Sequence, residues 1–171
     1  MPCKIKWTSL RAFLALLVFS AGLLASSSGF AGTTTTTLSV TLTINAGCTV
    51  SSSPVAFPAQ SVLASAVSQT GSLTVTCTNT TPYNVGLDKG SGTGATITNR
   101  LMTGPSSATV TYGLFQDSGH STNWGNTVGT DTVAGTGNGS AQTLTVYGHI
   151  APQTTPQPGA YADTVNVTVT F

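Results

Sequence analysis

The sequence predicts an all-β domain, with a sandwich and a barrel as the two architectures that fit. After residue 31, every periodic stretch alternates apolar and polar side chains with a period of two, as half-buried strands do. Clusters of Gly, Ser, Asn and Pro separate these stretches and favour turns. Helical spacing of apolar residues occurs only before residue 31. Many short strands with turn signals between them indicate a sandwich or a barrel.

The first 31 residues have the layout of a secretory signal peptide. Three basic residues precede an apolar run from Ala12 to Ala25, and small residues follow up to Ala31, where we expect cleavage. An uncleaved membrane anchor is the alternative, but the run is short for a span of about 20 residues. We therefore expect residues 1–31 to be removed, the chain to be exported, and no integral membrane segment to remain.

The strands are predicted in chain order from their apolar faces. The first contains Leu38, Val40, Leu42 and Ile44 on one face, with Thr and Asn opposite. The last contains Val165, Val167, Val169 and Phe171 on one face, and its final side chain is expected to point at the core. The long predicted strands cover residues 38–48, 71–80, 108–117, 141–152 and 163–171, with shorter candidates at 53–60, 82–90 and 94–102. Turns are predicted at 88–94, 133–140 and 152–159.

Charge is scarce. Only 5% of the chain is charged, and after residue 31 two basic residues stand against four aspartates, a net charge of −2. A chain without a basic patch is not expected to bind nucleic acid, nor to hold an anionic membrane surface. Low repulsion combined with Thr-rich faces suits a chain that packs against copies of itself, and it would also suit an adhesive surface.

Two cysteines remain after residue 31, Cys48 and Cys77. In the strand that contains it, Cys77 shares a face with Leu73 and Val75, so its side chain is expected to point inward. An even pair of cysteines in an exported protein predicts a disulfide, with two buried free thiols as the alternative. A bridge closing a loop of this span would stabilise the fold by about 3–4 kcal/mol.

The residues give little support for catalysis. There is no Glu, and the four Asp residues are scattered, which does not suit a paired-carboxylate hydrolase. Asp117, Ser118 and His120 lie within one Gly-containing loop, whereas catalytic triads are assembled from separate elements. Two isolated histidines without a Cys/His cluster do not suit a metal site. We expect no enzyme, no cofactor and no metal.

Two further residues invite a functional interpretation. Trp124, in a polar loop, could stack on a sugar or could pack over the edge of the sandwich. His149 alternates out of phase with its apolar neighbours and is expected to face solvent.

Several stretches together resemble a known family. "YGLFQDSGHSTNWGN" at residues 112–126 and the segment from residue 135 to 171, which contains "AQTLTVYG" and ends in "PGAYADTVNVTVTF", are similar to the spore coat protein U domain. "LTINAGCTV" and "GSLTVTCTNTTPYNVGLD" fit the same family. The resemblance extends from about Leu38 to Phe171. This domain also forms the subunits of archaic, Csu-type chaperone–usher pili.

The resemblance implies an incomplete immunoglobulin-like β-sandwich that lacks its last strand. Val165, Val167, Val169 and Phe171 would then lie on the penultimate strand, beside an open acceptor groove. In chaperone–usher systems a periplasmic chaperone fills such a groove first, and the N-terminal strand of the next subunit then replaces it by β-strand addition.

The same resemblance suggests a donor strand near the start of the exported chain. Leu38, Val40, Leu42 and Ile44 are its candidate anchors, although this stretch could also be an ordinary first strand of its own domain. We expect a donor segment at 32–47, overlapping the first strand, and a sandwich domain at 48–171.

The predicted function is a structural subunit of a surface pilus that supports attachment and biofilm formation. Its expected partners are copies of itself or related pilins, a periplasmic chaperone and an outer-membrane usher. Two rivals remain: a spore- or cell-coat protein of the same family, and a carbohydrate-binding adhesin that uses the Trp124 loop.

Overall fold

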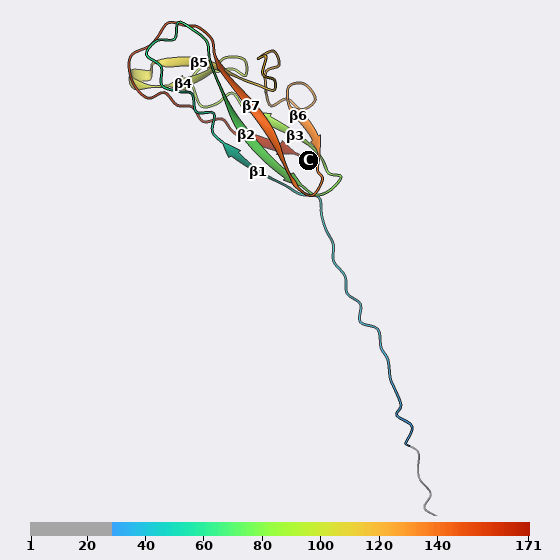
Figure 1. Cartoon of the computed structure of the whole chain (residues 1–171). Coiled ribbons are helices and arrows are strands. Elements are labelled where there is room, and N and C mark those ends of the chain that lie inside the picture. The colour runs from blue at the N-terminus through green and yellow to red at the C-terminus, as the bar shows by residue number, and fades with distance from the viewer. Residues whose placement is uncertain (1–28) are drawn as a thin grey trace, which may run out of the picture. The chain divides into compact units, whose positions relative to one another are not determined.

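The computed structural model describes residues 29–171 (Figure 1). Most of the expected signal peptide lies outside the described residues, so its removal stays a prediction. Within the described part, no helix has both the length and the apolar character that crossing a membrane requires. Residues 29–47 contain neither helix nor strand, and the sandwich begins at Cys48.

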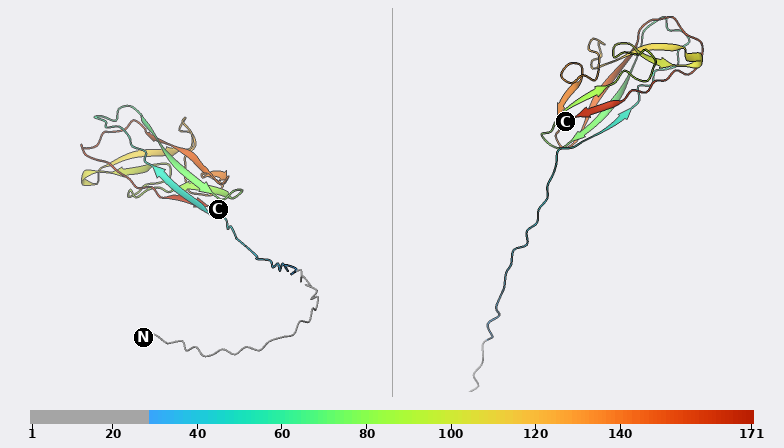
Figure 2. Two further views of the ribbon diagram at one scale, coloured as in Figure 1. Left: turned by 60° about the horizontal axis from the view of Figure 1, so that its bottom comes forward. Right: turned by 180° about the vertical axis from the view of Figure 1, so that it is seen from behind.

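Two antiparallel sheets make up the fold, which is therefore a sandwich (Figures 1 and 2). The larger sheet has the order β1 (Cys48–Ser53), β2 (Val67–Cys77), β7 (Ala141–Ile150), β5 (Thr109–Phe115) and β4 (Arg100–Thr103). The smaller sheet has the order β6 (Val133–Thr136), β3 (Pro82–Leu87) and β8 (Val167–Thr170). A short 3-10 turn, η1 (Pro105–Ser107), lies between β4 and β5. The all-β prediction is confirmed.

The longest strand pair, β2 with β7, shows how the period of two builds the core. Their register runs from Val67 opposite Ile150 to Thr76 opposite Ala141. Because side chains alternate across a strand, the inward positions of both strands face the smaller sheet. Cys77 is buried as predicted. The buried apolar cluster draws on both sheets: Leu63, Leu73, Val75, Cys77, Tyr83, Val85, Leu87, Val110, Tyr112, Leu114, Trp124, Val146 and Ile150.

One predicted strand and one predicted turn differ from the structure for reasons of backbone chemistry. Residues 54–60 form no strand, because Pro54 and Pro58 have no N–H to donate to a ladder. Conversely, β6 lies within the 133–140 cluster that was predicted to be a turn. Gly135 is accommodated in this strand because the Tyr83 ring lies where its Cβ would be.

The last predicted strand is shorter than expected. β8 covers four residues, so Val165 and Phe171 lie outside it. Phe171 is 59% exposed, which corrects the expectation that the core covers it. The reason lies in the sheet order, because β8 is an edge strand that pairs only with β3 and has no second neighbour among residues 29–171.

Candidate functional site

An apolar groove opens between the two sheets next to β8. Its volume is about 440 Å³. Strands of both sheets line it with side chains that belong to the core, and the segments before β2 and before β8 complete its walls. The lining includes Leu73, Leu87, Met102, Tyr112, Leu114, Val146, Val165 and Val167, together with residues 52–57 and 161–163.

Two free sheet edges border this groove. β8 ends the smaller sheet and β1 ends the larger one. The two strands lie close together, as Figure 2 shows from two sides. An edge strand presents unpaired backbone N–H and C=O groups, so this opening offers both hydrogen bonds and apolar surface.

The β8 segment supplies one apolar wall of the groove through Val165 and Val167, whereas Val169 and Phe171 do not line it. Val165, Val167 and Val169 pack against the core yet stay only partly buried. In the register with β3, Val167 lies opposite Leu87 and Val169 opposite Val85. Their alternation with exposed polar residues keeps all three valines on the inner face. Residues 29–171 therefore cover only part of the apolar side of this strand.

One end of the groove carries a polar pair. The Tyr112 hydroxyl donates a hydrogen bond of 2.7 Å to Oδ2 of Asp163. Burial and this hydrogen bond both raise the pKa of Tyr112, so the phenol stays protonated. Burial acts to raise the pKa of Asp163, but hydrogen bonds from Tyr112, Ser91 and Thr164 outweigh it and lower the pKa. An ionised carboxylate therefore sits at the groove wall.

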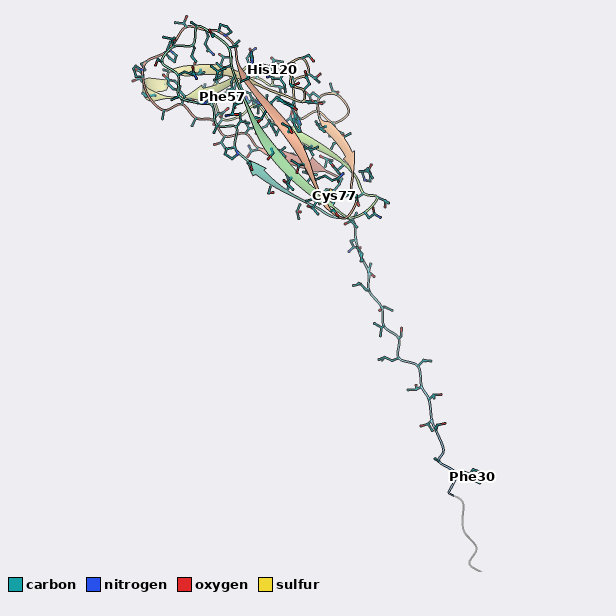
Figure 3. All side chains as sticks on the ribbon, viewed as in Figure 1. Phe30, Phe57, Cys77 and His120 are labelled. Atoms are coloured by element: carbon teal, nitrogen blue, oxygen red, sulfur yellow. A yellow bond between two sulfur atoms is a disulfide. The ribbon has the colours of Figure 1, made fainter. Side chains whose placement is uncertain are left out.

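A short apolar segment lies across the larger sheet and lines part of the groove. Val55 and Phe57 occupy the space above two glycines, Gly71 on β2 and Gly148 on β7. A Cβ at Gly71 would lie 2.8 Å from Val55, and one at Gly148 would lie 2.9 Å from Phe57. Glycine is thus required at both positions for this close approach. Figure 3 shows Phe57 towards the end of the sandwich that is opposite to Cys77.

The candidate donor anchors are the most exposed aliphatic side chains of the described chain. The exposed fraction is 87% for Leu38, 86% for Val40, 85% for Leu42 and 75% for Ile44. None of them lies in a strand here, since β1 begins only at Cys48. Aliphatic side chains left in water in this way are available for burial elsewhere.

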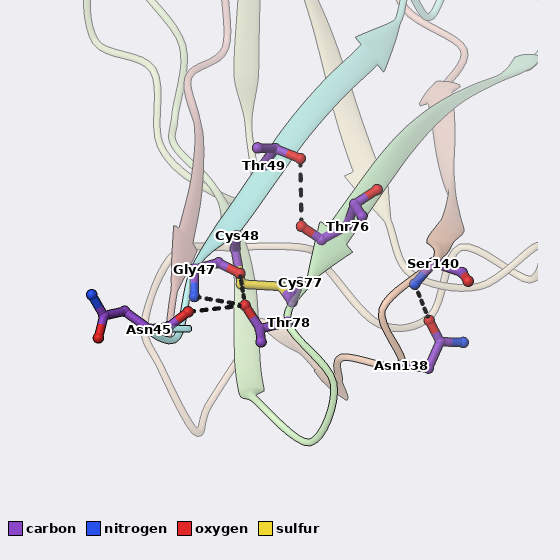
Figure 4. The surroundings of a disulfide bond; sticks show 9 residues. All are labelled: Asn45, Gly47, Cys48, Thr49, Thr76, Cys77, Thr78, Asn138 and Ser140. Carbon is purple, nitrogen blue, oxygen red and sulfur yellow. Dashed lines mark hydrogen bonds between the residues drawn. A yellow bond between two sulfur atoms is a disulfide. The ribbon is translucent and has the colours of Figure 1, made fainter. Parts of the chain in front are cut away.

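The disulfide between Cys48 and Cys77 is present, with an S–S distance of 2.01 Å. It joins two residues that lie directly opposite each other on β1 and β2 (Figure 4). Cys48 is the first residue of the sandwich, so the bridge anchors the point at which the chain enters the fold.

Trp124 is not a surface residue. It is 1% exposed, and its indole Nε1 donates a hydrogen bond of 2.8 Å to the carbonyl of Val85. A buried indole is not available to stack on a sugar, so the carbohydrate-binding interpretation of this residue is wrong. The alternative interpretation, that Trp124 packs against the sandwich, is confirmed.

Sequence reasoning missed Arg100, which is fully buried. Its guanidinium donates to the carbonyls of Asp88, Ile97, Leu87 and Trp124 at 2.7–3.1 Å. The side chain thus ties β3, β4 and the Trp124 loop together. No periodic pattern could reveal it, because a charged residue at a strand start normally predicts exposure.

The loop around Asp117 has a structural role in the described chain. The Asp117 carboxylate accepts hydrogen bonds from the backbone N–H groups of Ser121 and Thr122. These bonds lower its pKa and fix the turn, as Asx motifs do. His120 stacks on His149 at a centroid distance of 4.3 Å, and no group of three or more potential ligands that could hold a metal is found among residues 29–171.

Comparison with known proteins identifies relatives by sequence and by fold. The profile of the Spore Coat Protein U domain matches residues 34–168. No curated protein matches the chain. Among solved structures, a CsuC–CsuE chaperone–tip adhesion subunit pre-assembly complex, from archaic chaperone-usher Csu pili of Acinetobacter baumannii, has a TM-score of 0.55 at 22% identity. That likeness covers 75% of this chain and 41% of the other, and it speaks for the fold alone.

A second solved structure is more remote. A chaperone–tip adhesin complex of CFA/I fimbriae biogenesis has a TM-score of 0.36 at 12% identity, and the match covers 71% of this chain and 41% of that one. A likeness at this level carries no argument. The chain spans about two fifths of the length of each solved chain that it matches.

Proposed function

The chain belongs to the Spore Coat Protein U domain family, and from that premise we propose that it is a structural, non-enzymatic subunit of a surface fibre. Successive subunits join by donor-strand exchange: the segment Leu38–Ile44 of one copy enters the groove of the next and pairs with β8. The expected signal peptide directs the subunit to the periplasm, and the finished fibre lies on the cell surface, where it supports attachment and biofilm formation.

One observation carries this proposal, namely that the chain holds two complementary unfinished surfaces. The groove beside β8 lacks a strand on its free edge and exposes half-buried valines. The segment Leu38–Ile44 offers four exposed aliphatic side chains at strand spacing. A strand added to an exposed edge gains backbone hydrogen bonds, and its alternate side chains fill pockets. A second copy of the same chain supplies what the first one lacks.

The open groove also accounts for the assembly partners. A free sheet edge beside apolar surface is an aggregation hazard, so an unassembled subunit requires a cover. A periplasmic chaperone of the kind named in the structurally similar complex is the proposed cover, and an outer-membrane usher is the proposed site of exchange. A coat protein of the same family, built by the same exchange without a long pilus, is the second candidate, and the family's own name favours it.

The test uses one charge on either face of the donor segment. Leu42→Asp puts a carboxylate among the anchors, whereas Thr43→Asp puts the same charge on the opposite face one residue away. Each full-length variant is expressed together with its chaperone and usher, and surface fibres are scored by electron microscopy. We expect Thr43→Asp to form fibres and Leu42→Asp to leave soluble, chaperone-bound subunits.

Two outcomes would contradict the proposal. Normal fibres from Leu42→Asp would show that the segment is not the donor. Equal loss of soluble subunit from both variants would mean that residues 38–44 belong to the subunit's own core.

A further inference from the structure

We propose that Thr78, acting with the Cys48–Cys77 disulfide, clamps the base of the donor segment and makes the joint between consecutive subunits stiff. Thr78 is then a positioning residue: it does not enter the groove but fixes the direction in which the donor leaves its own sandwich. The inference rests on the proposed function and adds to it a mechanical property of the fibre.

The contacts lie at the entry of the chain into the fold (Figure 4). The Gly47 N–H donates a hydrogen bond of 3.1 Å to Oγ1 of Thr78. The Thr78 hydroxyl donates in turn either to the Gly47 carbonyl at 3.2 Å or to the Asn45 carbonyl at 3.3 Å. The Thr78 N–H adds a backbone bond of 2.9 Å to the Gly47 carbonyl. One threonine thus holds both backbone groups of Gly47 and reaches back to Asn45.

Two further bonds fix the part of the sandwich next to this contact. The disulfide joins Cys48 to Cys77, the residues next to Gly47 and Thr78. The N–H of Gly139 donates to the carbonyl of Cys77 at 3.1 Å, so the loop before β7 supports the same point. Thr78 is therefore attached to a fixed part of the sandwich.

The position of the clamp leaves the donor almost no free linker. Ile44 is the last apolar anchor, and Asn45, immediately after it, is already within reach of Thr78. Of the three residues between the anchor and the first strand, Asn45 and Gly47 are hydrogen-bonded to Thr78. A flexible linker of n residues would span roughly 5–6 Å × √n and let two subunits swivel. Here the donor and the sandwich meet with no such stretch.

Gly47 explains why a clamp is needed at this place. Glycine is the residue with the widest choice of backbone conformations, and a Cβ at this position would have only Thr78 Oγ1 near it, at 4.0 Å. Without the hydrogen bonds that its N–H donates to Thr78 and that its carbonyl accepts from Thr78, Gly47 would be the natural hinge of the fibre. With these hydrogen bonds, backbone rotation at Gly47 is restricted.

The decisive experiment compares Thr78→Val, which keeps the shape and removes the hydroxyl, with Thr78→Ser, which keeps the hydroxyl. Fibres of each full-length variant are imaged, and the bending persistence length is obtained from their contours. We expect Thr78→Val to shorten the persistence length at least about twofold and Thr78→Ser to leave it unchanged. The melting temperatures of the two variants should differ by only a few degrees, since Thr78→Val removes the two side-chain hydrogen bonds of Thr78 but leaves its backbone bond to Gly47 and the disulfide in place.

A second pair of variants guards against failed assembly of Thr78→Val. A Gly-Ser pair inserted between Ile44 and Asn45 adds a hinge while the clamp stays intact, and the same pair inserted after the exposed Val128 is its control. We expect only the first insertion to soften the fibre. Fibres that all bend alike would overturn the clamp but leave the fibre proposal standing. Absence of fibres from the unaltered chain with its chaperone and usher would instead refute the proposed function, and the clamp with it.

Discussion

If the groove beside β8 is the site of a missing strand, supplying that strand within the same chain should complete the fold. The perturbation is a second copy of "TLSVTLTIN", residues 37–45, attached behind Phe171 through a Gly/Ser linker. Phe171 is 59% exposed and lies just beyond β8, so an extension from it does not disturb a buried residue. The product should be a monomer that needs no chaperone.

The size of the effect follows from the exposure of the anchors. Leu42 is 85% exposed in the free segment, so nearly all of its burial is still available. Burying such a side chain contributes about 1.5–3 kcal/mol. An aspartate in its place loses that contribution and brings an unpaired carboxylate to an apolar groove, which costs several kcal/mol more. The intact and substituted copies should therefore differ by at least about 3 kcal/mol in the free energy of unfolding.

Thermal unfolding of three fused chains measures this difference. One carries the intact copy, one carries the copy with Leu42→Asp, and one carries the copy with Thr43→Asp as the matched control. A change of 1 kcal/mol shifts the melting temperature of a domain of this size by roughly 3–4 °C, so the first two chains should differ by about 10 °C. The third chain should melt close to the first. Equal melting of all three, at the temperature of the unextended chain, would refute the assignment of groove and donor.

Two predictions concern the sandwich itself. Arg100→Lys keeps the charge, but an ammonium cannot donate to all four carbonyls that the guanidinium contacts. Because each unpaired buried carbonyl costs about 1–3 kcal/mol, the free energy of unfolding measured in urea should fall by roughly 2–4 kcal/mol. An unchanged midpoint would show that the carbonyls find other donors. Burial, and then the nearby His120, lower the pKa of His149 below its ordinary value of about 6.5, so the folded state binds fewer protons than the unfolded state just below that pH. The contribution of neutral His149 to stability should thus be fully present above about pH 6.5 and be lost as the pH falls through the lowered pKa. His149→Gln should flatten this pH dependence in urea titrations at successive pH values. A rise in stability on acidification would contradict this reasoning.

Periodicity predicted the central strands well because their two faces see different surroundings. β2, β5 and β7 each lie between two neighbours in the larger sheet, and their alternation of apolar and polar residues reflects one buried face. The inward direction of Cys77 followed from its phase with Leu73 and Val75. A bridge to Cys48 then required only that the first residue of β1 lie opposite, as it does.

The sequence was least informative where a side chain serves a specific partner. The burial of Arg100 depends on four carbonyls brought together by three segments, and that of Trp124 depends on the carbonyl of Val85. Gly135 marks a strand only because Tyr83 lies over it, while in the sequence it looks like part of a turn. These features arise from contacts that are distant in the chain, and no local pattern contains them.

The segment Leu38–Ile44 illustrates a different limit, since periodicity reports that a face is apolar but not what covers it. This segment has the same alternation as the central strands, yet it forms no strand and its side chains remain in water. At the other end of the chain, Val165–Phe171 has the same length and the same period, but only four of its residues are paired. Among the described residues, Leu38–Ile44 has no sheet edge to pair with, and β8 has no second neighbouring strand. Pairing between two copies would satisfy the free backbone groups of β8 and allow the strand to extend over its full periodic length. Until then, a chain with only 5% charged residues has little electrostatic repulsion to keep such edges apart. Under the proposed function, such a subunit would therefore depend on a chaperone or a neighbouring copy from the moment it folds.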